Sequence, residues 1–129
     1  MIYFIVGIAG VLGALFRYDL GLLIHSWWSL SFPLETLLIN YLGCIILGWF
    51  TPWAASHKNF PSWIRVGFGT GFIGSFTTFS TFSAETLALI QKGLWGIAIL
   101  YVLLSLWGGL LMAWCGYRLF KLRGITREE

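Results

Sequence analysis

Four long stretches of apolar residues divide the chain, and each is long enough to cross a membrane as a helix. The hydrocarbon core of a bilayer requires about 20 apolar residues in helical form. The sequence predicts such helices over residues of about 2–25, 33–53, 62–91 and 94–120. Short polar segments separate them, and Pro52 and Pro61 mark one of these segments. The expected fold is an all-α membrane protein, a single four-helix membrane domain over residues 1–129.

The third stretch is the least like an ordinary apolar helix. Its glycines Gly67, Gly69, Gly71 and Gly74 each lower helix propensity by up to about 1 kcal/mol relative to alanine. Threonines and serines crowd the segment SFTTFST that follows, so we expect the helix to be broken near residues 74–78. Irregular backbone at membrane depth must be buried in protein or face a cavity, and transport proteins bind ions at such breaks. Carbonyl oxygens freed there would suit a hard cation.

Composition supports a membrane location and determines orientation only weakly. Of 129 residues, 58% are hydrophobic and 10% are charged, whereas soluble domains carry about 25% charged residues. The formal charge of +3 comes mostly from the tail residues Arg118, Lys121, Arg123 and Arg127. They suit anionic lipid headgroups, and nothing indicates nucleic acid. The positive-inside rule favours cytoplasmic termini, but without the tail the bias almost disappears, so insertion in both orientations stays open.

Polar side chains in the second and fourth stretches recur at helical spacing. Thr36, Asn40 and Cys44 share one helical face, and Tyr101 and Ser105 share another. An asparagine in a membrane helix is often a hydrogen-bonding contact between helices, and Asn40 fits that role and an ion-ligand role equally well. A hydroxyl stripe alone indicates helix packing.

Aromatic and hydroxyl residues alternate just after the expected break. Phe79 and Phe82 lie three residues apart on one helical face, beside Ser80 and Thr81, and Glu85 follows. A phenyl ring has a negative face and a positive edge, so a ring placed edge-on attracts an anion weakly. Core packing is the ordinary explanation for such a pair, but it does not account for the hydroxyls around the rings.

Two further features of the apolar stretches concern packing. Arg17 lies within the first stretch, where bonding to helix-end carbonyls or to a carboxylate is favoured over a transport role. Glycine and alanine recur on likely faces of the first, second and fourth stretches. Small residues let membrane helices approach closely, either between copies of the chain or within one copy.

The segment GFIGSFTTFSTFSAE, residues 71–85, closely resembles the signature of the fluoride-specific ion channels of bacteria, the Fluc or CrcB family. The resemblance covers the whole chain, including GALFRY in the first stretch and LLINYLGC in the second. It implies a fluoride-selective passive channel of the bacterial cell (inner) membrane that exports cytoplasmic fluoride and so gives fluoride resistance. It also implies a homodimer of dual topology, with its two subunits inserted antiparallel.

The same resemblance implies roles for individual residues. Phe79 and Phe82 match the aromatic pair that lines the fluoride route, and Asn40 matches the amide that bonds the anion near those rings. Ser80 and Thr81 match the polar rail beside them.

The resemblance also implies roles for further positions. Less specific matches, to polar positions along the ion route or at its entrance, are Thr36, Tyr101, Ser105 and Glu85. The main-chain carbonyls of Gly74 and Thr77, contributed by both subunits, match a central site for Na+ that is structural and not transported. Arg17 matches a basic position of the first span.

Two other functions fit a small chain with four spans. A multidrug or cation exporter would need a membrane-embedded carboxylate to exchange protons for its cation, and here the first stretch holds Arg17, with Asp19 near its end. A non-transporting structural subunit would use its polar residues in helix contacts. An enzyme is not expected, because His25 and His57 lie apart and no nucleophile–base set or metal cluster is evident.

Overall fold

The computed structural model describes the backbone of residues 1–125 and the side chains of residues 1–122, and this part of the chain is helical with short connections. Arg127 of the basic tail lies outside the described residues, as does the side chain of Arg123. The α-helices and π-helical segments (η) are α1 (Ile2–His25), α2 (Leu34–Ser56), α3 (Ser62–Val66), η1 (Gly67–Ile73), α4 (Gly74–Phe76), α5 (Phe79–Gln91), α6 (Trp95–Leu103), η2 (Leu104–Gly108) and α7 (Gly109–Ile125).

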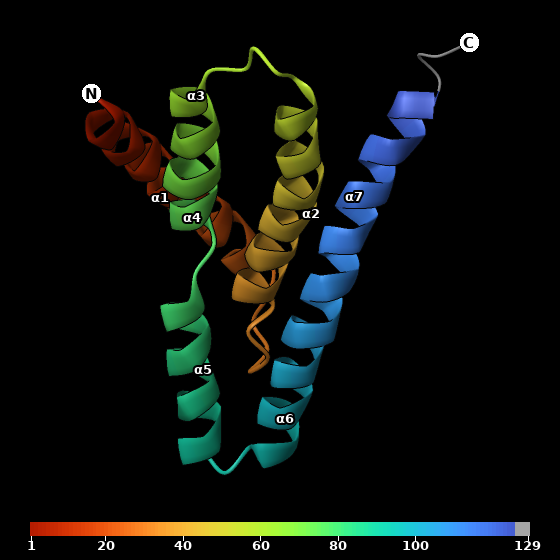
Figure 1. The fold of residues 1–129 in the computed structure, drawn as a ribbon. Coiled ribbons are helices and arrows are strands. Elements are labelled where there is room, and N and C mark those ends of the chain that lie inside the picture. The colour runs from red at the N-terminus through yellow and green to blue at the C-terminus, as the bar shows by residue number, and fades with distance from the viewer. Residues whose placement is uncertain (126–129) are drawn as a thin grey trace.

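The helices run up and down in succession, as Figure 1 shows. α3, η1 and α4 follow one another end to end, and α5 continues beyond a short extended link. α6, η2 and α7 form one long helix that returns to the end of the molecule where the N-terminus lies. α2 packs along α7, and α1 packs along η1 and α4.

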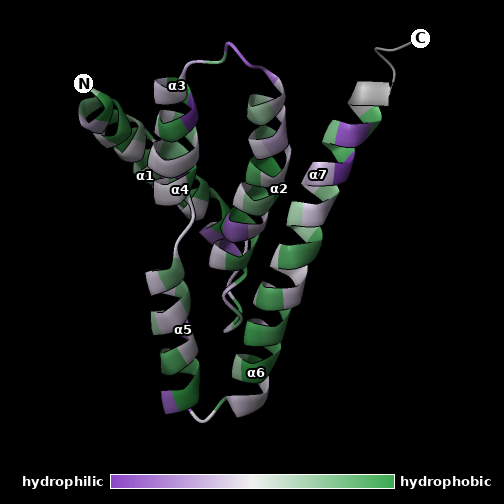
Figure 2. Cartoon of the chain, viewed as in Figure 1, coloured by the Kyte–Doolittle hydropathy of each residue, from purple (hydrophilic) through white to green (hydrophobic). Residues whose placement is uncertain are grey.

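Within the described residues, three helical stretches are long and apolar enough to cross a membrane: Ile2–His25, Leu34–Ser56 and Trp95–Leu122. The remaining stretch, residues 62–91, consists of shorter helices, because the backbone of Thr77 and Thr78 is extended. Figure 2 shows hydrophobic colour along most helices, with hydrophilic colour at the loop between α2 and α3 and near the C-terminal end of α7.

α2 extends beyond the end expected near Trp53 and includes Pro52, which the sequence places at a loop. A proline removes one helical N–H and crowds the carbonyl four residues earlier, so helices often end near it. Here the last turn has outside support. Arg65 from α3 donates from Nη2 to the Ala54 carbonyl at 2.8 Å, which satisfies one of the free carbonyls of the helix end.

Small residues bring backbones together within the single chain. A side chain added at Gly48 would overlap the Ala113 carbonyl of α7, and one added at Gly116 would overlap the Ile45 carbonyl of α2. A side chain at Gly13 of α1 would likewise meet the backbone of η1. At these positions the small residues serve close packing inside one subunit, one of the two explanations that the sequence leaves open.

Candidate functional site

The extended link between α4 and α5 is the centre of the candidate site. Thr77 has a ψ of 158°, and Thr78 has φ and ψ of −146° and 124°. β-Branched residues favour this extended region. Thr78 is also the N-cap of α5, since its hydroxyl accepts a hydrogen bond from the Thr81 N–H at 3.1 Å. The same residue therefore ends the link and starts the next helix.

Asn40 of α2 binds the link through both ends of its amide. Its Nδ2 donates to the Thr78 carbonyl at 3.0 Å, and its Oδ1 accepts from the Thr78 N–H at 2.9 Å. The side chain thus replaces the partners that a continuing helix would give to Thr78. The amide nitrogen of Asn40 carries two N–H groups. One donates to Thr78, so the other is left to donate elsewhere.

At the link, two main-chain carbonyls also lose the N–H donors that a continuing helix would give them. In a continuing helix the Thr78 N–H would donate to Gly74, and the Thr81 N–H to Thr77. These N–H groups bond instead to Asn40 Oδ1 and to the Thr78 hydroxyl. In the part of the chain that the structure describes, no group of three or more His, Cys, Asp or Glu side chains could hold a metal ion. Main-chain carbonyl oxygens are ligands of the kind that hard cations take.

A groove of about 430 Å³ lies beside the link and joins four of the predicted pathway residues. Its lining includes Asn40, Thr78, Phe79, Phe82, Ser105, Tyr41 and Cys44. The rings of Phe79 and Phe82 lie 5.7 Å apart, tilted by 41°. Phe79 is 79% exposed, so its ring is open to a ligand or to another protein surface. The groove combines an amide donor, several hydroxyls and aromatic rings in a mostly apolar setting.

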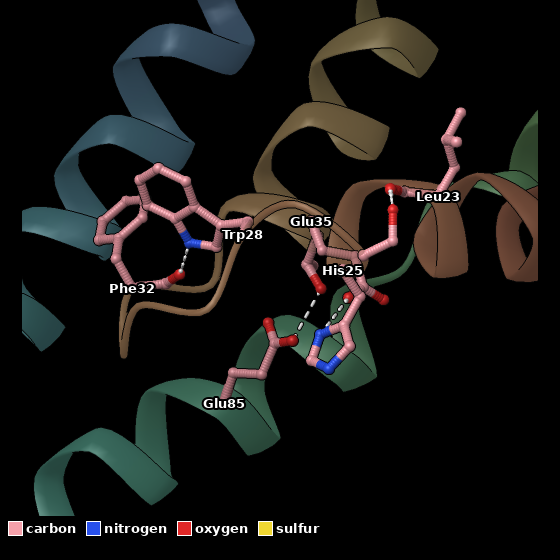
Figure 3. Close-up of polar contacts among 8 residues, drawn as sticks. Leu23, His25, Trp28, Phe32, Glu35 and Glu85 are labelled. Carbon is pink, nitrogen blue, oxygen red and sulfur yellow. Dashed lines mark hydrogen bonds and ion pairs between the residues drawn. The ribbon is translucent and has the colours of Figure 1, made fainter.

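Thr36, Glu85 and Tyr101 form a separate polar cluster next to the groove. Thr36 Oγ1 donates to one Glu85 carboxylate oxygen at 2.8 Å, and the Tyr101 hydroxyl donates to the other at 2.7 Å. Thr36 and Tyr101 are buried. Figure 3 shows Glu85 near Glu35 and His25. His25 Nδ1 and Glu35 Oε2 lie 3.8 Å apart. The hydroxyl protons of Thr36 and Tyr101 therefore point to Glu85, and the Tyr101 ring contacts Phe82 at 5.2 Å between centroids.

Ser80, Thr81 and Arg17 lie outside the groove lining. Ser80 and Thr81 are exposed on the first turn of α5, within 3.3 Å and 3.0 Å of the Thr78 hydroxyl. Thr81 and Arg17 line a different hollow of about 340 Å³, between α1, the start of α2 and the start of α5. Among the described residues, Arg17 makes no hydrogen bond or ion pair with a carbonyl or a carboxylate.

Two residues of the site were not singled out from the sequence. Thr78 could have been recognised, because a threonine just before a helix is a common N-cap. Tyr41 could not, because it directs its hydroxyl to the main-chain carbonyl of Leu104, which is 63 residues away. A backbone acceptor leaves no pattern of side-chain types that a sequence would reveal.

The chain matches known bacterial proteins over most of its length. The family model described as "CrcB-like protein, Camphor Resistance (CrcB)" matches residues 4–117. The fluoride-specific ion channel FluC 1 of Bacillus cereus is 59% identical over 119 residues, which cover 92% of this chain and 87% of that relative.

More distant relatives carry a similar name. FluC 2 of Geobacillus kaustophilus is 47% identical over 117 residues, 91% of each chain. FluC 2 of Listeria monocytogenes is 41% identical over 129 residues, all of this chain and 97% of that one. With three helical stretches apolar enough to span a bilayer, the protein is a multi-pass bacterial membrane protein. The chain belongs to the CrcB-like family.

Proposed function

We propose that this chain is a fluoride-selective channel that lets the ion pass down its electrochemical gradient. The observation that carries the proposal is the groove of about 430 Å³, where Asn40, Phe79, Phe82 and Ser105 meet beside the α4–α5 link. The relatives, which are named fluoride-specific ion channels and are up to 59% identical to this chain, supply the ion.

Fluoride is small and strongly hydrated, so a selective pathway must replace its water. The remaining N–H of Asn40 and the hydroxyl of Ser105 are donors in the groove, and the edges of Phe79 and Phe82 add a weak attraction. Sites of modest strength in series allow the ion to leave as well as enter. A larger, more weakly hydrated anion such as chloride gains less from compact donors and fits a narrow route poorly.

The direction of flow follows from the membrane potential. With the inside negative, an anion moving passively is driven outward. Fluoride that entered the cell as neutral HF and then lost its proton would leave by this route, so the channel would confer fluoride resistance without energy input.

We also propose that residues 62–91 form one interrupted span, and that two copies of the chain assemble antiparallel with a structural Na+ between them. The carbonyls of Gly74 and Thr77 lose their usual helical donors to Asn40 and Thr78, which supports their use as ligands. One copy supplies two such oxygens, and a second copy would complete a set of four. The ion would add positive charge near an anion pathway and hold the links together.

Sodium removal tests the cation site. Purification in a buffer with N-methyl-D-glucamine in place of Na+ should abolish fluoride flux or dissociate the dimer, and returning Na+ should restore both. Full activity and an unchanged dimer without Na+ would disprove this site and leave the channel proposal intact.

Anion efflux from liposomes tests the function itself. The purified chain, reconstituted alone and in Na+, should release loaded fluoride rapidly and retain loaded chloride, each followed with an ion-selective electrode. If neither anion leaves liposomes containing demonstrably folded protein, the channel proposal fails, and proton-coupled cation export becomes the next function to measure.

A further inference from the structure

Tyr41 connects α2 to the π-helical turn η2. Its hydroxyl donates to the Leu104 carbonyl, and its ring lies directly against Gly108, where an added side chain would overlap the hydroxyl and ring atoms. α2 and η2 contact each other along this stretch, and Figure 1 shows α2 beside the helix that η2 belongs to. Ser105, which lines the groove, lies on the same turn, next to Leu104.

A π-helical turn requires stabilisation from its surroundings. Such turns are rare, occur mostly as single insertions in α-helices, and are frequent at functional sites. In a regular π-helix the Leu104 carbonyl would accept from the N–H five residues later, that of Gly109. The Gly109 N–H bonds instead to the carbonyls of Ser105 and Leu106. The Tyr41 hydroxyl gives the Leu104 carbonyl a donor from outside its own helix, and at membrane depth neighbouring helices can satisfy irregular backbone in this way.

We propose that Tyr41 is a positioning residue of the fluoride pathway, which holds η2 so that the Ser105 hydroxyl stays in the groove with Asn40 and Phe82. This inference rests on the proposed channel function. It adds Tyr41, which acts on the pathway through Ser105. Tyr41 reaches the pathway from α2, next to Asn40, so one helix fixes two sides of the groove. Asn40 holds the link at Thr78, and Tyr41 holds η2.

A direct ligand role for Tyr41 is disfavoured by the direction of its hydrogen bond. Tyr41 lines the groove, but a phenol has a single proton, which is directed to Leu104. Only oxygen lone pairs remain for the groove, and these repel an anion. The hydroxyl could donate to fluoride only after giving up the bond to Leu104.

The test compares Tyr41→Phe with wild type in the liposome efflux assay. Loss of the hydroxyl should slow fluoride release by about three- to tenfold, the range expected for one lost hydrogen bond. Tyr117→Phe is the matched control, because that tyrosine is exposed on α7 outside the groove, and it should match wild type. If Tyr41 acts through Ser105, the double variant Tyr41→Phe/Ser105→Ala should be no slower than Ser105→Ala alone.

Each alternative outcome has a defined meaning. Wild-type flux in Tyr41→Phe, or losses that multiply in the double variant, would overturn the positioning role while the channel stands. Absence of flux in wild type would instead refute the proposed function. If Tyr41→Phe does not fold, Gly108→Ala displaces the same hydroxyl from the η2 side. Fluoride flux through Gly108→Ala should fall at least as far as expected for Tyr41→Phe. Wild-type flux through Gly108→Ala would also overturn the inference.

Discussion

Phe82 connects the groove to the carboxylate cluster at the scale of single residues. Its ring lies 5.7 Å from that of Phe79 and 5.2 Å from that of Tyr101. Tyr101 in turn donates to Glu85 at 2.7 Å. The Phe82 ring therefore packs between the rings of Phe79 and Tyr101. An aliphatic residue of similar volume would fill the space without a positive ring edge.

Replacing Phe82 with isoleucine is expected to slow fluoride efflux from liposomes by about tenfold or more, because the ring edge that we propose to face the ion is lost. The variant should still elute as the assembled protein in size-exclusion chromatography. Phe4→Ile is a suitable control, because Phe4 is 73% exposed near the start of α1. Unchanged flux in Phe82→Ile would rule out the role assigned to the ring.

The residue roles in the candidate site were predictable only in part. The helical spacing of Thr36 and Asn40 predicted that both share one face of α2. In the structure that face points inward, since Thr36 bonds to Glu85 and Asn40 to Thr78. Whether Asn40 contacts a helix or an ion was open, and the structure shows the contact to Thr78. Its ion-ligand role stays a prediction. Spacing along one helix cannot reveal a partner 38 residues away.

At the scale of elements, the α4–α5 link depends on a neighbouring helix for its hydrogen bonds. The two bonds between Asn40 and Thr78 join α2 to this link. Two unpaired main-chain groups at membrane depth would be costly. The conformation of the link is therefore determined by α2 as well as by its own threonines.

Asn40→Ala should lower the free energy of unfolding by about 1–3 kcal/mol, the cost of leaving buried polar groups unsatisfied. Amide hydrogen exchange should rise first at Thr78 and Thr81. Ser83→Ala is the control, since that hydroxyl bonds only to the Phe79 carbonyl of its own helix. Equal protection and stability in the two variants would show that Asn40 does not hold the link.

The elements themselves differ in how far the sequence determines them. Apolar length alone predicts four spanning helices, because the bilayer sets that length. In the described residues, three of these stretches form helices long and apolar enough to span it. The π-helical segments η1 and η2 were not predicted, since their register depends on packing against other helices. A side chain at Gly71, within η1, would meet the Val6 carbonyl of α1. That contact exists only after α1 and η1 pack together.

At the scale of the whole molecule, one copy of the described chain leaves large apolar side chains exposed on several helices. Tyr3 and Leu23 of α1 and Trp107 of η2 are each more than 60% exposed, as suits surfaces that face lipid or another copy. The N-terminus and α7 end on the same side. The loop with Lys58 and the turn with Lys92 therefore lie at opposite ends, each with one lysine.

This arrangement gives a direct test of dual topology. A cysteine at position 92, in a chain whose Cys44 and Cys115 are replaced by alanine, should react with an impermeant thiol reagent from both sides of the membrane. A cysteine at position 58 is the matched probe at the other end and should behave alike. If position 92 reacts from one side only and position 58 from the other side only, the chain has one fixed orientation instead.

The π-helical turn η2 makes the protein sensitive to changes of length. α6 and α7 share one axis, but the π-helical turn between them sets the rotation of α7 about that axis. Deleting one residue between 104 and 108 would turn α7 by about 100° relative to α6. Ala113 and Gly116 would then leave the backbone of α2, which they contact directly. A single-codon deletion here should therefore abolish folding, whereas most substitutions at lipid-facing positions of the same helix should be tolerated.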